Sequence, residues 1–407
     1  MLIAALAAVL AAGATGTAAK TERGFVPAGP AAKSYAPSAA SAGRPPAPGD
    51  PLRARIVAEA AAVARKLGRK PPTPDRRLDW AMTDLARNIR GDELPALEVL
   101  QFLTAHYGLV EAPPRIVLSH TSPAGAADIP DRVRDELTEL SRGPAMGRIG
   151  VGIERTPDAI YVAVALQATP LKLTAPIARK LPSGGHAKIA ARVERVYRDP
   201  SVVITSPDGS VRGEAAAVVG GIAQGDLRCG KDGVYQVEIT GADAHGAEVL
   251  ANFPVYCGAT PPARSPGRAG MSQTVVKAED AERQMVALVN RDRKRAGLPA
   301  VVADATLAGI ARAHSRDMVD NDFVGHVSPR TGAAVDRVRR GGVSPGLVLE
   351  NVGRAYSTEQ AESGFLSSPG HRSNILHPEA RKLGVGIVLG APVGGVTPML
   401  VTQLFTN

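Results

Sequence analysis

Aromatic side chains are scarce in this chain of 407 residues, since Phe, Trp and Tyr together make up only 3% of it. Cysteine is almost absent, with Cys229 and Cys257 as the two occurrences. Two cysteines cannot build a zinc finger or a disulfide-rich scaffold, so the core must come from aliphatic residues. The length predicts two or three domains at about 150 residues each.

Basic runs interleaved with aromatic residues are also missing, although the net charge is +9. The 48 Lys and Arg residues are scattered, which is typical of a solvated basic surface and excludes a recognisable nucleic-acid interface. Weak attraction to anionic cell-wall polymers or lipid headgroups is the alternative.

The start of the chain, "MLIAALAAVLAAGATGTAAK", is an apolar run that ends in small residues, with no Lys or Arg before it. It predicts a signal peptide over residues 1–19 and export to the cell envelope, the periplasm or the medium. In an exported protein Cys229 and Cys257 form a disulfide, whereas in a cytosolic one they are buried free thiols. The Pro- and Ala-rich segments 20–51 and 259–273 predict disordered linkers.

Periodicity divides the rest into a multi-domain α+β chain. Residues 52–170 show helical spacing and then strands, which predicts a small α+β module. Residues 171–258 alternate apolar and polar residues between "PDG" and "KDG" turns, which predicts an immunoglobulin-like β-sandwich. "IGVGIER" in the first module resembles "LGVGIVLG" near the end, so the first module is either a degenerate copy of the last or an unrelated domain.

The C-terminal module, residues 274–407, has helical patterns followed by two closing strands. "DATLAGIARAHSRDM" predicts a helix with Asp304 as its N-cap. His314 falls on the apolar face of that helix and is predicted to be a core histidine. "STEQAESGFL" predicts a further helix that begins after Ser357, where Gln360 completes a capping box.

Seven motifs follow one another in this module: "LVNRDRKRAGLPAV", "LAGIARAHSRDM", "DFVGHVSPRTG", "ENVGRA", "SSPGHRSNILHP", "KLGVGI" and "LVTQLF". In this order they resemble a bacterial CAP domain, the superfamily of cysteine-rich secretory proteins, antigen 5 and pathogenesis-related proteins, also described as SCP-like. The resemblance implies an α-β-α sandwich with a central cleft. It covers about a third of the chain and nothing before residue 270.

The resemblance also implies a cleft built from two His and two Glu. By motif, His326 comes from "GHVSPRTG", Glu350 from "ENVG" and His371 from "SPGHR". This chain departs from the eukaryotic pattern, because Ser368 and Leu400 stand where the second Glu and the second His are expected, and His371 of "SPGHR" is used in place of that second His. Two imidazoles and a carboxylate are able to bind zinc through His326 and His371 and leave one position for water. The alternative is a hydrogen-bonded cluster without a metal.

Four other polar residues are weighed against this cleft. The position of Glu362 relative to the cleft is not fixed by the motifs, and His377 is predicted to lie in a surface loop. His120 stands in "SHTSPAG", which looks like "GHVSPRTG" but follows a strand pattern and lacks the partner motifs. We therefore predict no site role for His120, and a core position for His314.

Two functions follow as expectations. The first is a secreted or envelope protein whose cleft binds a small ligand, either a lipid or a cell-wall fragment. The second is a metal-assisted hydrolase acting on peptide or peptidoglycan bonds, which would rest on the His and Glu cluster alone because both cysteines are predicted to be structural. No nucleic-acid partner is expected.

Overall fold

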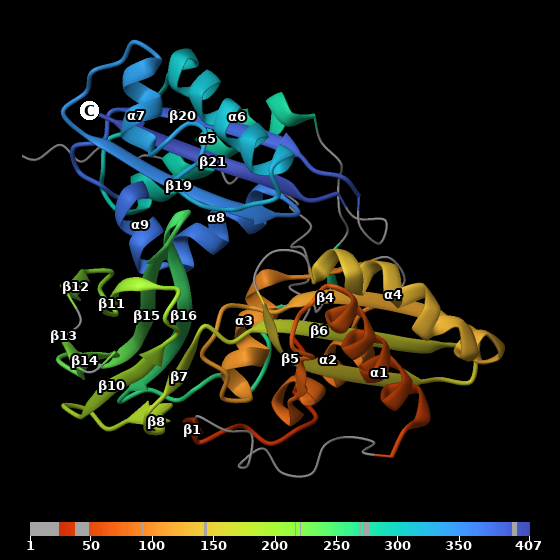
Figure 1. The fold of residues 1–407 in the computed structure, drawn as a ribbon. Helices are drawn as coiled ribbons and strands as arrows, with labels where there is room; N and C mark the ends of the chain where they lie inside the picture. The colour runs from red at the N-terminus through yellow and green to blue at the C-terminus, as the bar shows by residue number, and fades with distance from the viewer. Residues whose placement is uncertain are drawn as a thin grey trace, which may run out of the picture.

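The computed structural model describes residues 24–36, 49–90, 93–141, 145–215, 217–219, 221–267, 270–271, 277–392 and 397–407. The chain is a mixed α+β protein in which three groups of elements, each with its own sheets, follow one another (Figure 1). The predicted signal peptide, residues 1–19, lies outside the described residues. Within the described ranges, no helix has the length and apolar character that a membrane span needs.

The first group is a four-stranded sheet with helices on both faces. Its elements are α1 (Pro51–Lys66), β2 (Thr73–Pro74), α2 (Arg76–Asn88), β3 (Leu94–Pro95), α3 (Leu97–His106), β4 (Arg115–Thr121), the 3-10 helix η2 (Pro123–Asp128), α4 (Ile129–Leu140), β5 (Met146–Arg155) and β6 (Ile160–Ala168). The strand order is β2-β5-β6-β4. Side chains alternate along β6. Ala163 therefore packs with α2 and α3, whereas Val164 packs with α1 and α4.

The central group consists of two sheets around one core. Its elements are β7 (Leu171–Leu173), β8 (Ile177–Ala178), β9 (Lys180–Leu181), β10 (His186–Val193), β11 (Arg198–Thr205), β12 (Val211–Ala215), β13 (Ala217–Val219), β14 (Ile222–Arg228), β15 (Gly233–Asp243) and β16 (Gly246–Cys257). The strand orders are β13-β14-β10-β7 and β12-β11-β15-β16-β9. Ile189 of one sheet and Val237 of the other are fully buried in the same cluster.

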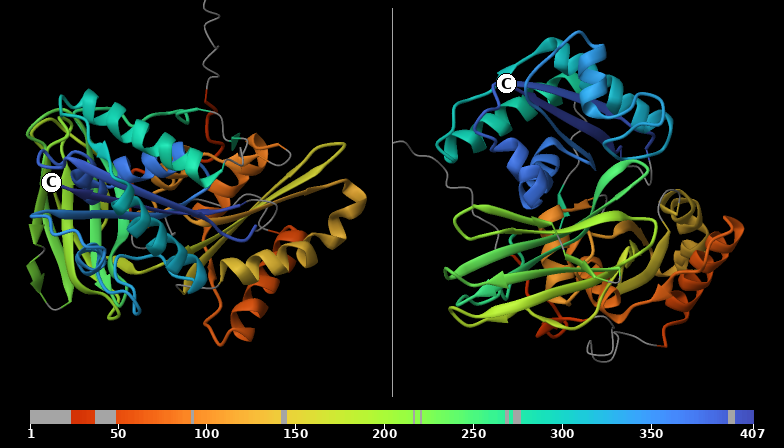
Figure 2. Two further views of the ribbon diagram at one scale, coloured as in Figure 1. Left: turned by 90° about the horizontal axis from the view of Figure 1, so that it is seen from above. Right: turned by 60° about the vertical axis from the view of Figure 1, so that its left-hand side comes forward.

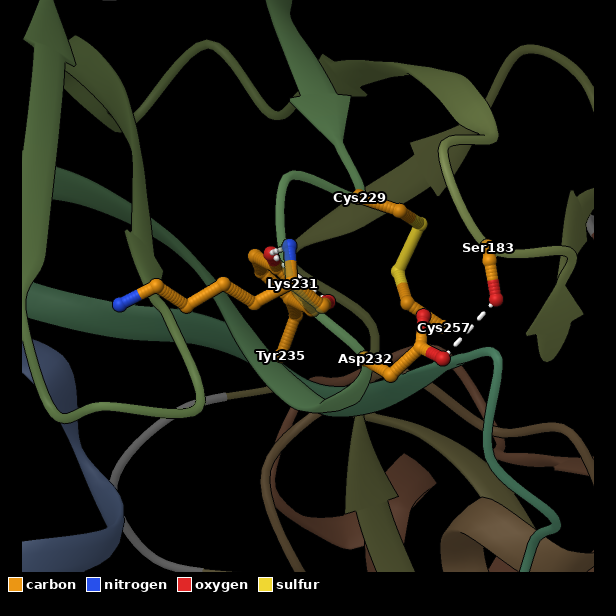
Figure 3. The surroundings of a disulfide bond; sticks show 6 residues. All are labelled: Ser183, Cys229, Lys231, Asp232, Tyr235 and Cys257. Atoms are coloured by element: carbon orange, nitrogen blue, oxygen red, sulfur yellow. Dashed lines mark hydrogen bonds between the residues drawn. A yellow bond between two sulfur atoms is a disulfide. The ribbon is translucent and has the colours of Figure 1, made fainter.

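The predicted disulfide between Cys229 and Cys257 is confirmed. It joins the end of β14 to the end of β16 across a sequence separation of 28 residues, and both cysteines are buried (Figure 3). Beside it, Ser183 Oγ donates a hydrogen bond of 2.9 Å to Asp232 Oδ2.

The last group is again a four-stranded sheet between helices. Its elements are α5 (Ala278–Arg295), β18 (Val302–Ala303), α6 (Ala305–Asp320), α7 (Ala334–Arg340), β19 (Val348–Ala355), α8 (Thr358–Ser367), α9 (Pro369–Ile375), β20 (Lys382–Leu389) and β21 (Met399–Thr406). The order is β18-β20-β21-β19. On β21, Val401 packs with α5 and α8, and Leu404 packs with α6 and α7. Asp304 caps α6 as predicted, because its side chain accepts a hydrogen bond from Leu307 N.

The first and last sheets share more than their strand order. A Cβ added to Gly386 of β20 would lie 2.0 Å from Arg312 N of α6, and one added to Gly152 of β5 would lie 2.1 Å from the backbone carbon of Met82 in α2. Each strand carries a second glycine two residues earlier, at equally close range to the same helix. The recurring "GVG" therefore marks strands on which a helix lies in backbone contact, which only glycine permits.

Parts of the two predicted linkers differ from the expectation of disorder. Within the segment 20–51, Tyr35 is fully buried in the central core, and β1 (Ser34–Tyr35) pairs with β8. Within the segment 259–273, β17 (Gly270–Met271) pairs with β3. A Pro- and Ala-rich composition predicts disorder on average. In the segment 20–51, however, the buried side chain of Tyr35 holds the residues around it against the central core.

Candidate functional site

His326 and Glu350 meet at the last sheet. His326 lies in the loop after α6, and Ser328 Oγ holds that loop by accepting hydrogen bonds from the N–H groups of Arg330 and Thr331. Glu350 lies on β19, and its side chain is only 3% exposed. The distance from His326 Nδ1 to Glu350 Oε1 is 3.0 Å, so the two groups form a direct hydrogen bond.

Arg337 of α7 balances the buried carboxylate. Its Nη2 donates to Glu350 Oε2, and its Nη1 donates to the backbone oxygen of His326 at 3.2 Å. A buried carboxylate needs such a partner because an unpaired charge is costly to remove from water. Arg337 was not predicted from the sequence, since an arginine in the basic stretch "AVDRVRR" is typical of a solvated helix face.

His371 comes from a third segment, the short helix α9. Ser368 is the N-cap of this helix and accepts a hydrogen bond from His371 N. The ring centroid of His371 lies 6.2 Å from that of His326 and 5.2 Å from that of Phe365. Burial, followed by the charge of His326, lowers the pKa of His371 to about 3, so this imidazole is neutral at physiological pH. The structure thus brings His326, Glu350 and His371 together.

A polar chain lies behind this cluster, on the other face of β19. Asn351 Nδ2 donates to Gln403 Oε1 at 2.9 Å and to the backbone oxygen of His371 at 3.2 Å. Gln403 Nε2 donates to Glu362 Oε2 at 2.9 Å, and burial raises the pKa of Glu362 to about 7. Glu362 therefore supports the backbone that carries His371 rather than joining the two histidines. Alternation along the strand explains why Asn351 faces away from its neighbour Glu350.

The central sheets also contribute, through the hairpin of β15 and β16 that reaches the last group (Figure 2). Glu238 of β15 is fully buried and accepts a hydrogen bond of 3.3 Å from Gly370 N, just before His371. Burial raises the pKa of Glu238 to about 7. In the hairpin turn, the backbone oxygen of His245 accepts a hydrogen bond of 2.8 Å from Val327 N, just after His326. The loop that carries His326 and the start of the helix that carries His371 are therefore both held by hydrogen bonds to the central module.

The geometry of the cluster bears on the predicted zinc ligands His326 and His371. Among the described residues, no group of three or more His, Cys, Asp or Glu side chains is arranged to hold a metal ion. Glu350 is already bonded to His326 and Arg337, and the guanidinium places a positive charge where a cation would have to sit. The residues therefore fit a zinc ion poorly, and the chemistry of the cluster is that of hydrogen-bond donors and acceptors.

The other histidines lie elsewhere. His314 is 1% exposed, and its Nε2 lies 2.9 Å from Gly325 O, which confirms the predicted core position. His377 lies beyond the end of α9, where its Nδ1 accepts a hydrogen bond from Glu379 N. His120 lies on β4, and its ring stacks on that of Tyr161.

Comparison with known families assigns the module that carries the cluster. Residues 286–405 match the model of the cysteine-rich secretory protein family, abbreviated CAP. The C-terminal third of this chain is a CAP domain. The resemblance predicted from the seven motifs is confirmed, and His326, Glu350 and His371 all lie within the matched residues of the CAP domain.

Two curated relatives each match less than a third of this chain. The uncharacterized protein YkwD of Bacillus subtilis is 34% identical over 130 residues, which are 31% of this chain and 51% of YkwD. The uncharacterized membrane protein YlbC of the same organism is 36% identical over 107 residues, which are 26% of this chain and 31% of YlbC. The chain thus spans about half of the first relative and under a third of the second.

Two solved structures are similar to parts of this chain. An extracellular protein containing an SCP domain from Bacillus anthracis is 24% identical, with a TM-score of 0.30 and coverage of 44% of this chain and 65% of that chain. A cysteine-rich secretory protein from Staphylococcus aureus is 14% identical, with a TM-score of 0.27 and coverage of 63% of this chain and 84% of that chain.

Proposed function

We propose that this chain is an exported protein of the cell envelope whose CAP cleft binds a small ligand, a cell-wall fragment or a lipid. The single observation that carries the proposal is the convergence of His326, Glu350 and His371 from three separate segments, with a direct bond of 3.0 Å between the first two. Polar side chains that converge at rigid loops are typical of binding sites.

The chemistry of the cleft favours an uncharged, hydroxyl- or amide-bearing ligand. Glu350 is neutralised by Arg337, and His371 is neutral because burial lowers its pKa to about 3. Within the described residues, no protein group bonds Nε2 of His326, whose side chain is 24% exposed. Such a set offers imidazole donors and acceptors beside a carboxylate that is already paired, which suits the sugar and peptide groups of a cell-wall fragment better than a charged headgroup.

A metal-assisted hydrolase is the second candidate. It would need Glu350 or an imidazole to be released for a metal and a water molecule, and Arg337 opposes this. We therefore place binding before hydrolysis. Zinc uptake stays a prediction that calorimetry at neutral pH tests on protein purified without a His tag.

The other modules would serve presentation of the cleft. We infer that the two central sheets form an immunoglobulin-like sandwich that holds the CAP domain away from its anchoring surface, and that residues 1–19 direct export. The disulfide supports export, because such bonds persist in oxidising compartments. The net charge of +9 would add attraction to anionic wall polymers.

The test separates the two candidates. The pure protein is incubated with peptidoglycan, casein and a lipid panel, with and without chelator, and both bound ligand and released product are measured. Binding that survives the chelator, without product, supports the first proposal. Product that disappears with the chelator supports the hydrolase instead.

A further inference from the structure

A cavity of about 740 Å³ lies between the CAP domain and the N-terminal sheet. Residues 115–118 of β4 line one side and residues 352–355 of β19, followed by Tyr356, line the other, with Asn252 of β16 between them. Leu100 of α3 and Phe365 of α8 add apolar surface. Of the residues His326, Glu350 and His371, only His371 borders this cavity, so most of its lining lies outside that cluster.

Both strands border the cavity along an edge rather than a face. β4 and β19 are each the terminal strand of their sheet. Successive side chains of a strand point to opposite faces, so a face would contribute only every second residue. Here consecutive residues of each strand line the cavity, and Val117, which is 2% exposed, borders it although its side chain packs into the core. The outer edges of two sheets therefore face one space, and no described strand pairs with the outer edge of β19.

One hydrogen bond shows which way the backbone groups of β19 point. Asn374 Nδ2 donates to the backbone oxygen of Glu350 at 3.0 Å, so this carbonyl points away from β21. Alternate residues of an antiparallel strand turn their N–H and C=O groups the same way. The backbone N–H and C=O groups of Val352 and Arg354 therefore point toward the cavity, further along the strand than the residue that Asn374 contacts. Such an edge is a template for another strand.

The cavity also brings two cations together. Arg115 of β4 and Arg354 of β19 both line it, and burial together with the charge of Arg354 lowers the pKa of Arg115. Arg115 Nη1 donates to Leu140 O at 3.0 Å, and Arg354 lies 3.7 Å from the exposed Asp322. Glu136 lines the same space, but burial raises its pKa and favours the neutral form. The charges of Asp322 and Glu248 partly oppose this lowering, and a ligand carboxylate between the two arginines would add to them.

We propose that this cavity binds a short extended peptide that carries a carboxylate. The peptide adds as a strand to the free edge of β19, places alternate side chains against the apolar lining, and sets its carboxylate between Arg115 and Arg354. A fatty amphiphile would fill the same apolar space but would leave both strand edges unpaired. The proposal goes beyond the His and Glu cleft, because it depends on residues of β4 and of the outer edge of β19.

The probe is a fluorescein-labelled hexapeptide of alternating valine and serine with a free C-terminal carboxylate, titrated with the full chain by fluorescence anisotropy. We expect saturable binding. The same peptide with methylated backbone nitrogens should not bind, because methylation removes the strand donors. The C-terminal amide should bind about 10-fold more weakly, the loss of one charge-assisted contact.

Matched variants locate the site. Val324→Trp fills the cavity from a side chain that is 41% exposed, and should weaken binding at least about 10-fold, whereas Val302→Trp, at an exposed site outside the cavity, should not. Arg354→Gln should remove the difference between acid and amide, and Arg283→Gln on α5 should keep it. Equal binding of the methylated peptide, or no saturable binding, overturns the proposal. Tighter binding of a dansylated fatty acid that Val324→Trp abolishes would assign the cavity to an amphiphile instead. None of these outcomes tests the His and Glu cleft. The four substituted residues, Val324, Val302, Arg354 and Arg283, are not part of it.

Discussion

At the residue scale, the cluster depends on keeping its imidazoles and carboxylate in defined charge states. Folding lowers the pKa of His371 from 6.5 to about 3. Between these values the unfolded chain binds the proton and the folded chain does not, so stability falls as the pH falls through this window. From pH 7 to pH 5 this single group accounts for a loss of about 2 kcal/mol.

We therefore expect His371→Gln to lose less stability than the parent chain between pH 7 and pH 5. Urea unfolding at both pH values measures the difference, and comparing the two proteins cancels the contributions of other titrating groups. His377→Gln, outside the cluster, is the matched control. An identical pH dependence of His371→Gln and the parent would show that His371 takes up its proton in the folded state.

Arg337 is the second residue for which a substitution is expected to change stability by a defined amount. Arg337→Gln leaves the 3%-exposed carboxylate of Glu350 without its cation, which should cost about 3–5 kcal/mol of unfolding free energy. The exposed Arg339 on the same helix gives the control, since Arg339→Gln should change stability by less than about 0.5 kcal/mol. Adding Glu350→Gln to the first variant should recover part of the loss. A neutral Arg337→Gln would mean that water already reaches Glu350.

At the scale of elements, the contact between α6 and β20 sets the position of the CAP helices. Gly386→Ala would put a Cβ 2.0 Å from Arg312 N, so the helix has to move, at a cost of about 1–3 kcal/mol or more. Gly309→Ala, in the same helix but with open space around it, should instead stabilise by up to about 1 kcal/mol. Thermal unfolding of both variants checks the contrast. Equal effects would argue against the close approach of α6 to β20.

Elements of the CAP domain were predictable because apolar periodicity and caps are local signals. Asp304 and the "GVG" strands were of this kind, and motif order added the three cleft residues. The roles of Arg337 and Glu238 were not predictable, because their neighbours along the chain give no sign of their partners in space. Arg337 lies beside the buried carboxylate of Glu350, and Glu238 lies beside Gly370, 132 residues away along the chain. Tyr35 was missed for the same reason, since its partners in the central core lie far along the sequence.

At the scale of the whole molecule, polar contacts join the CAP domain to both other modules. Gln101 Nε2 donates to Ser367 Oγ at 2.8 Å, and Asn252 Nδ2 donates to Ser367 O at 3.0 Å. Sequence patterns within one module cannot specify which edges of two sheets face each other. The cavity between β4 and β19 was therefore beyond sequence reasoning, and of these two strands only β4 lies in a segment that was predicted to be strand-like.

The CAP domain has apolar clusters of its own, built from residues after 278. We expect the fragment 274–407 to unfold cooperatively, at a lower temperature than the same domain in the full chain because it loses the contact of Gly370 with Glu238. Calorimetry of the fragment and the full chain tests this. A fragment without a cooperative transition would show that the CAP domain folds only with its neighbours.

The central claim is that the His and Glu cleft holds a small ligand, and ligand retention tests it most directly. The full chain and His326→Ala/His371→Ala are exposed to a digest of peptidoglycan and to a lipid extract, and then separated from free ligand. Mass spectrometry identifies what each protein retains, and circular dichroism checks that both are folded. The account predicts a cell-wall fragment or lipid that the parent chain retains and the folded double variant loses. Equal retention by both proteins, or no retained ligand on the parent chain, would contradict it.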